Sequence, residues 1–236
     1  MIISHIKTVI FSPNLADTIC ATLDENIRNT SSLSSGLSCV LLLSGENGIQ
    51  RAADKVTAMN EGRVMGGAIY CSINGQQVAS LAEILLNPKV NNSSTLDSCT
   101  CCIVKPHAVK MNDFGKILDV IISQGYDVSA IQSINFTKVQ AEEFYEVYKG
   151  VIPDYSDHVV QLCSGLSIAL ELRAEDAVPT FRLTAGPWDV EMAKELRPES
   201  LRAKFGVDKV RSAIHCTDLP VDAVAECEYV FRILSS

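Results

Sequence analysis

The stretch "RSAIHCTDLP", residues 211–220, resembles an earlier piece of the same chain, "MGGAIYCSI", at residues 65–73. Both pieces contain Ala-Ile, a ring, Cys and a hydroxyl residue in the same order, but His215 stands where the earlier piece has Tyr70. Each apolar run that ends at the ring predicts the end of a strand, and a helical pattern follows it. One pattern at two places indicates two related units.

Two further matches occur in the same order along the chain. "SGLSCVLLL" from Ser35 matches "SGLSIALEL" from Ser164, and "VIFSPNLA" can be laid on "CIVKPHAV" with Ser12 opposite Lys105. The spacings are shorter in the first copy, so we expect an internal duplication whose first copy is truncated. The segment "LNPKVNNSSTLDS", rich in Asn, Ser and Pro, predicts a connector. The predicted organisation is a degenerate domain at 1–88, a linker at 89–98 and an intact domain at 99–236.

The second part alternates between strand and helix patterns. Strands are predicted in "CCIV", "YDVSAIQSINF", "LSIALEL" and "KVRSAIH", with helices in "GKILDVIISQG", "KVQAEEFYEVYKG", "AVPTFRLTAG" and "VDAVAECEYVFRIL". This order predicts an α+β sandwich of ferredoxin-like βαββαβ type, with a four-stranded sheet and helices on one face, in two tandem copies of which the first is truncated.

Composition limits the class of protein. The 236 residues include 47% hydrophobic and 20% charged residues, which is typical of a soluble globular chain. A net charge of −8 argues against non-specific nucleic-acid binding. The start of the chain does not resemble a signal peptide and no run of about 18 apolar residues occurs, so we expect a cytoplasmic protein.

The nine cysteines are scattered and odd in number, which favours reduced thiols. The cluster "CTCC", residues 99–102, has two readings. Its alternation into "IVKP" favours the start of a strand. A metal site is the weaker alternative, because the spacing differs from that of a zinc ribbon.

Three motifs of the second part, "VKPHAV", "PESLRAKFG" and "AIHCTD", resemble the nucleoside diphosphate kinase family, as does Glu226, eleven residues after His215. The resemblance runs from about Cys99 to Phe231. It implies phosphoryl transfer between nucleotides through a phosphohistidine. Within the family, the chain is similar to tandem-domain members associated with cilia and axonemal doublet microtubules.

The resemblance also implies roles for single residues. His215 would accept the phosphate, and Glu226 and Thr217 would hold its imidazole. The expected nucleotide-binding residues are Lys105, Tyr145, Tyr155 (stacked on the base), Arg182, Arg202, Arg211 and Ser212. Magnesium would arrive with the nucleotide, because Mg²⁺ usually keeps phosphate and water ligands, so no protein metal site is expected.

Several positions depart from the family pattern. Ser212 stands where an asparagine binds the ribose, and the threonine expected near a phosphate falls at Trp188 or Asp189. His107-Ala108 replaces Asp-Gly. The alternatives also stay open for the charged residues: Arg182 and Arg211 could form surface ion pairs. The other histidines, including His158, are expected to be structural or exposed.

Tyr70 and Ser12 make the first copy catalytically silent, since a phenol with a pKa near 10 is a poor nucleophile at pH 7. We expect this copy to be a scaffold that pairs with the second as an internal pseudo-dimer. Two hypotheses follow. The first is a structural protein of ciliary or flagellar doublet microtubules, with tubulin and axonemal partners and a site for NTP and NDP. The alternative is a soluble housekeeping nucleoside diphosphate kinase.

Overall fold

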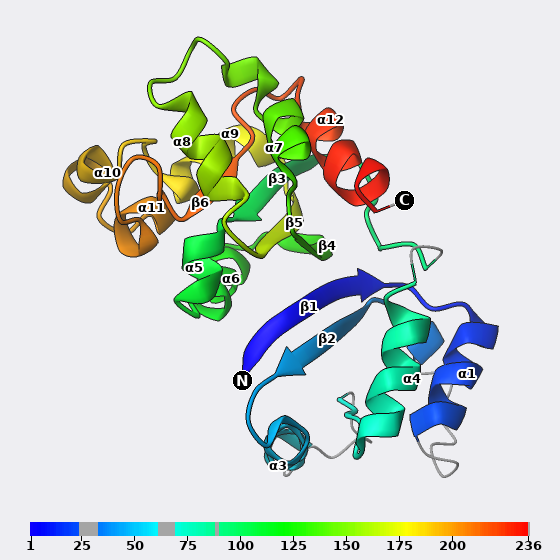
Figure 1. Cartoon of the computed structure of the whole chain (residues 1–236). Helices are drawn as coiled ribbons and strands as arrows, with labels where there is room; N and C mark the ends of the chain where they lie inside the picture. The colour runs from blue at the N-terminus through cyan, green and yellow to red at the C-terminus, as the bar shows by residue number, and fades with distance from the viewer. Residues whose placement is uncertain (24–32, 61–68, 88–89, 236) are drawn as a thin grey trace. The chain divides into compact units, whose positions relative to one another are not determined.

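The computed structural model describes residues 1–23, 33–60, 69–87 and 90–235. The chain divides into two compact units, Met1–Ser93 and Ser94–Ser236. The division falls inside the segment predicted as a linker. Figure 1 shows the elements of both units.

The second unit is built on four antiparallel strands. These are β3 (Cys99–Val104), β4 (Asp127–Ile134), β5 (Ser167–Arg173) and β6 (Ile214–Cys216). Their order across the sheet is β4-β5-β3-β6, and each neighbouring pair is antiparallel. This is the predicted α+β ferredoxin-like arrangement. The last strand is only three residues long, shorter than the sequence pattern indicated.

Helices fill every connection of the second unit (Figure 1). They are α5 (Pro106–Lys110), α6 (Phe114–Ser123), α7 (Lys138–Phe144), α8 (Tyr155–Leu162), α9 (Ala177–Ala185), α10 (Val190–Leu196), α11 (Leu201–Phe205) and α12 (Ala223–Glu228), with the turns η1 (Glu146–Tyr148) and η2 (Tyr229–Ile233). Gly125 and Gly150, predicted from the sequence to end helices, both have positive φ, 88° and 78°.

The expectation that helices cover one face of the sheet is wrong. All six residues of β3 are buried, although neighbouring side chains of a strand point to opposite faces. Cys101 and Ile103 belong to a core cluster with residues of α7, α8 and α12. Cys102 and Val104 lie outside this cluster, and α9 contacts both β3 and β6. A pattern of continuous burial therefore reflects helices on both faces.

The first unit contains β1 (Ile2–Val9), α1 (Pro13–Leu23), β2 (Ser38–Ser44), α3 (Gly48–Asn60) and α4 (Gly75–Leu85). β1 and β2 are antiparallel, as are β3 and β5, the strands to which they were matched. A core of Val9, Phe11, Ala16, Ile19, Leu81 and Leu85 joins β1 to α1 and α4. The tandem relationship of the two units remains a prediction.

The stretch around Tyr70 differs from the strand end that its sequence predicted. Residues 65–68 lie outside the described residues, and residues 69–72 form no strand. The ring of Tyr70 is 36% exposed, whereas His215 is buried in β6. Ladder hydrogen bonds to β3 hold the later copy in strand form. Among the described residues, the similarity of the two pieces extends to the helix that follows each, but not to strand structure at the ring.

The "CTCC" cluster forms the buried strand β3, and all nine cysteines are free thiols. The sulfur atoms of Cys99 and Cys227 lie within 4.8 Å of a carboxylate oxygen of Glu171. This carboxylate accepts hydrogen bonds from the amides of Thr95 (2.7 Å) and Leu96 (3.1 Å) and from Ser129 Oγ (2.6 Å). These hydrogen bonds satisfy the buried carboxylate, and they attach residues 95–96 to the sheet.

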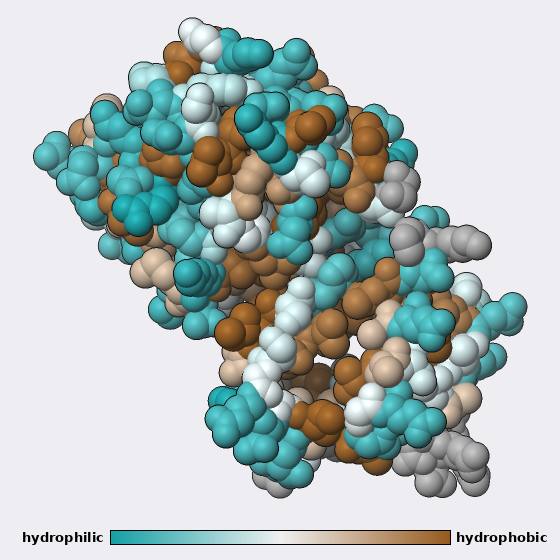
Figure 2. Space-filling model, viewed as in Figure 1, coloured by the Kyte–Doolittle hydropathy of each residue, from teal (hydrophilic) through white to brown (hydrophobic). Residues whose placement is uncertain are grey.

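The visible surface of the second unit is mostly hydrophilic, with hydrophobic residues in separate patches (Figure 2). Among the described parts of the chain, we find no helix with the length and apolar character needed to cross a bilayer.

Gly186, which follows α9, is held by close packing. Its φ is +84°, and a Cβ added there would lie 2.2 Å from Ser200 Oγ. Gly150 also has positive φ, but a Cβ there would meet nothing within 4 Å. Of these two glycines, Gly186 alone combines a positive φ with a close approach of another segment.

We expect Gly186→Ala to lower the free energy of unfolding by about 2–4 kcal/mol, the sum of backbone strain and overpacking. The matched control Gly150→Ala should cost only the backbone part, about 1–2 kcal/mol. Urea unfolding of both variants measures the difference. Equal losses would mean that Ser200 yields without cost.

Candidate active site

His215 lies in the middle of β6 and pairs with Ile103 of β3. Its side chain is fully buried and points to the face of the sheet where α7 and η1 lie. The ring of Phe144 is 4.9 Å from the imidazole, and the rings of Tyr145 and Tyr148 are 6.0 and 6.2 Å away. This aromatic surround fixes the plane of the imidazole.

A short hydrogen-bonded network fixes the protonation pattern of His215. Its Nε2 lies 2.9 Å from Glu226 Oε2, which also accepts from Thr217 Oγ1 at 2.8 Å. Thr217 is in turn anchored to β3, because its Oγ1 accepts from the Cys101 amide at 3.0 Å. A carboxylate can only accept, so Nε2 carries the hydrogen and Nδ1 keeps a free lone pair. Nδ1 has no hydrogen-bond partner within the protein.

Lys105 follows β3 directly and occupies the N-cap position of α5. Its Nζ donates to the carbonyl of Val210 and to Ser212 Oγ, both at 3.0 Å. The side chain is 1% exposed. Burial, and next the charge of Arg202, lower the pKa of Lys105 to about 7. Near neutral pH the lysine is therefore protonated in part, and an anion that enters the site favours its charged form.

The three arginines are placed differently. Arg202 of α11 is buried, and its guanidinium donates to the carbonyl of Gly186 at 2.8 Å. Arg182 of α9 is half-exposed and pairs with Asp218 at 2.6 Å. Arg211 is exposed and pairs with Asp208 at 2.6 Å. Both surface ion pairs that the sequence left open are therefore present.

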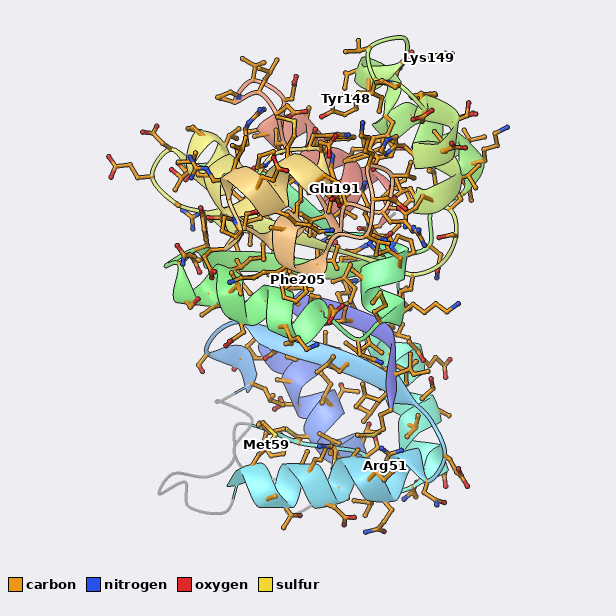
Figure 3. The ribbon with its side chains drawn as sticks, turned by 90° about the vertical axis from the view of Figure 1, so that its left-hand side faces the viewer. Arg51, Met59, Tyr148, Lys149, Glu191 and Phe205 are labelled. Carbon is orange, nitrogen blue, oxygen red and sulfur yellow. The ribbon has the colours of Figure 1, made fainter. Side chains whose placement is uncertain are left out.

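The two tyrosines predicted to bind the nucleotide have different surroundings. Tyr145 is fully buried beside His215, and burial followed by the charge of Glu226 raises the pKa of its hydroxyl. Tyr155 instead donates to the carbonyl of Glu142 at 3.3 Å, and no contact joins it to His215 or to the cations. Tyr148 lies nearer, and its hydroxyl donates to Asp218 at 2.8 Å. Figure 3 labels Tyr148 in η1 and Glu191 on α10, the segments that flank the site.

Three site residues were not assigned a role from the sequence. Trp188 lies 5.5 Å from Lys105 Nζ and 5.4 Å from the guanidinium carbon of Arg202. The ring of His158 lies 5.2 Å from Trp188. His107 follows Lys105-Pro106 in the chain, and this position was the feature of the sequence that could have indicated a place in the site. Burial, and next the charge of Lys105, lower the pKa values of both histidines to about 4.

Buried polar atoms without a partner concentrate here. Among the described residues, eight buried side-chain atoms lack a hydrogen-bond partner, and six belong to the site or to side chains beside it. They are His107 Nε2, Tyr145 Oη, His158 Nδ1, Gln161 Oε1, Arg202 Nε and His215 Nδ1. Leaving each unpaired costs about 1–3 kcal/mol. The donors among them, Tyr145 Oη and Arg202 Nε, fit an anionic ligand with several oxygens, and they lie beside two buried cations.

A cavity of about 450 Å³ opens beside this cluster. Its lining includes Arg182, Arg202, Trp188 and Asp218, but neither His215 nor Lys105. The imidazole therefore does not line this cavity.

A buried imidazole has one nitrogen bound and one free, and the same unit holds a buried lysine and a buried arginine. Such an arrangement is typical of proteins that bring an anion to a histidine. The model of the family "Nucleoside diphosphate kinase" matches residues 98–234. Nucleoside diphosphate kinase homolog 7 of Mus musculus is 49% identical over 145 residues, which are 61% of this chain and 37% of the mouse protein.

Nucleoside diphosphate kinase of Aquifex aeolicus is 39% identical over 132 residues, 56% of this chain and 92% of that protein. A crystal form of the Aquifex enzyme superposes with a TM-score of 0.55 at 38% identity, covering 58% of this chain and 97% of the other. The chain belongs to the nucleoside diphosphate kinase family. Its match spans little more than a third of the mouse relative.

Lys105 provides a test of the site's electrostatics. Its folded pKa is about 7, while an unfolded lysine titrates near 10.4. Between these pH values the unfolded chain binds one more proton, so the lysine makes the free energy of unfolding rise with pH by about 1.4 kcal/mol per pH unit.

We therefore expect the stability of the wild type to rise relative to that of Lys105→Met between about pH 7.5 and 9. Urea unfolding at several pH values measures this difference. Parallel pH profiles of the two proteins would contradict the lowered pKa.

Proposed function

We propose that the second unit transfers the γ-phosphate of a nucleoside triphosphate to a nucleoside diphosphate through a phosphohistidine at His215. The observation that carries the proposal is the free, buried and unpartnered Nδ1 of an imidazole whose Nε2 is tied to Glu226. A neutral imidazole is a competent nucleophile near neutral pH. Membership of the family supports the same chemistry.

In the first half-reaction, the Nδ1 lone pair forms a bond to the γ-phosphorus. The bond from that phosphorus to the β–γ bridging oxygen breaks, and the diphosphate leaves with the electron pair. The Nε2 hydrogen stays in place, and the carboxylate of Glu226 stabilises the imidazolium character that develops. A second diphosphate then attacks the phosphohistidine by the reverse path.

Positive charge for the phosphate oxygens would come from Lys105 and Arg202, which are buried, and from Arg182 at the cavity wall. Tyr145 would donate its unpartnered hydroxyl. Ser212 already accepts from Lys105, so it would orient the lysine rather than replace the ribose contact of an asparagine. Tyr155 stays the candidate that would stack on the base.

The site residues do not fit a protein-held magnesium ion. The oxygens of Asp218 are engaged by Arg182 and Tyr148, and Glu226 Oε2 is engaged by His215 and Thr217. Mg²⁺ would therefore enter as part of the nucleotide substrate, as proposed from the sequence.

The chemistry predicts a labelled protein. Incubation with γ-³²P-ATP and Mg²⁺ should give an acid-labile phosphoprotein, and His215→Asn should abolish the label, because the amide offers no nucleophilic nitrogen. His5→Gln, in the first unit, should retain it. Label of equal intensity in His215→Asn would place the acceptor elsewhere.

For the whole chain, we propose a structural role in ciliary or flagellar doublet microtubules, with tubulin and other axonemal proteins as partners. The resemblance of the sequence to tandem-domain family members associated with cilia supports this role, as does a first unit with Tyr70 and Ser12 in place of the nucleophile and the lysine. Its packing on the second unit as a pseudo-dimer remains part of the proposal. The alternative is a housekeeping kinase that balances nucleoside triphosphate pools.

Localisation separates the two roles. A tagged chain expressed in ciliated cells should co-sediment with salt-washed axonemes, and His215→Asn should do so equally, because a structural role needs no phosphoryl transfer. A tagged chain that remains in the detergent-soluble fraction would favour the housekeeping alternative.

A further inference from the structure

Trp188 lies between two buried cations. Its ring centre is 5.5 Å from Lys105 Nζ and 5.4 Å from the guanidinium carbon of Arg202. These distances fall within the range of cation–π contacts, and tryptophan is the aromatic residue that forms the strongest ones. One indole therefore serves both positive groups.

Neither cation forms an ion pair with a carboxylate of the described residues. Lys105 and Arg202 are 1% and 4% exposed. Their hydrogen bonds go to backbone carbonyls, to Ser212 Oγ and, at 3.5 Å, to Cys216 Sγ. Since buried charges are normally paired, the electron-rich face of the indole is the nearest substitute for an anion.

The backbone around Trp188 holds the ring in place. Gly186 packs against Ser200 and accepts from Arg202 through its carbonyl. On the other side, Asp189 caps α10 by accepting from the Glu191 amide at 2.9 Å, and it pairs with Lys209 at 3.1 Å. The backbone is thus anchored on both sides of Trp188, which leaves rotation of its side chain as the available motion.

The ring also lines the open cavity. It does so together with Arg182 and Arg202, and it meets the rings of Tyr148 and His158. His215 and Lys105 are buried and do not line the cavity. Because the ring centre lies within 5.5 Å of both cations, a phosphate chain that binds both of them must compete with the indole.

We propose that Trp188 sets the phosphate affinity of this site: its indole takes the place of an anion between Lys105 and Arg202, and a phosphate chain binds by displacing it. The inference rests on the proposed nucleotide site and adds the residue that competes for it. The ligand class is a di- or triphosphate group, whose oxygens would take over both cations.

Trp188 is the single tryptophan of the chain, so its fluorescence reports this event directly. Titration of the wild type with pyrophosphate, and separately with ADP, should move the emission maximum to longer wavelength as the ring leaves its packed position. Adenosine, which has no phosphate, should leave the emission unchanged.

Affinity is measured by calorimetry on the full chain with the same two ligands. Trp188→Thr should bind pyrophosphate and ADP about 10- to 30-fold more tightly than the wild type, because no cation–π contacts have to be broken. Trp188→Phe should lie between the two, since phenylalanine is the weaker partner for a cation. The melting temperature of Trp188→Thr without ligand should fall, and saturating pyrophosphate should restore it.

Unchanged or weaker binding by Trp188→Thr, with binding by the wild type intact, would overturn the role of Trp188 and leave the proposed function standing. The same holds if the emission of the wild type does not respond at saturation. Failure of all three proteins to bind either ligand would overturn the proposed function together with this inference.

Discussion

The hydrogen bond between His215 Nε2 and Glu226 is the contact on which the site depends. It joins β6 to α12, and through Thr217 and the Cys101 amide it reaches the central strand β3. The donor and acceptor of each hydrogen bond in this series are fixed. One nitrogen of the imidazole therefore bonds to Glu226, and the other is left for a ligand. A nucleophile buried among aromatic rings is therefore presented in one orientation only.

This arrangement lowers the stability of the fold, because charged groups and polar atoms without hydrogen bonds are buried. Lys105 loses much of its tendency to hold a proton, and Arg202 keeps an unpaired Nε. Natural proteins tolerate such burial where a ligand repays it, which separates the site from the rest of the core. Elsewhere in the unit, the buried carboxylate of Glu171 accepts hydrogen bonds from neighbouring groups of the protein. Its burial therefore does not depend on a ligand.

The sequence predicted those features that depend on spacing along the chain. Eleven residues from a strand to the following helix bring Glu226 to His215, and Lys105 must lie next to β6 because it ends the neighbouring strand. Contacts between segments that are far apart in the sequence could not be predicted from spacing. The partner of Arg182, the second helical layer over β3 and the position of Trp188 over two cations depend on packing that no local pattern encodes. The role of Tyr155 at the base stays a prediction, since its one hydrogen bond, to the carbonyl of Glu142, says nothing of a ligand.

The geometry also separates chemistry from affinity. Under the proposed function, His215, Glu226 and Thr217 form a complete hydrogen-bonded unit, while Trp188 takes the place of a phosphate between Lys105 and Arg202. Selection on a structural role would leave the first intact, because His215, Glu226 and Thr217 join β3, β6 and α12 whether or not a nucleotide binds. It would not preserve an open cradle, because unpaired buried cations destabilise a protein that seldom binds an anion. A catalytic network that doubles as a structural tie can thus persist after the affinity for its substrate has weakened.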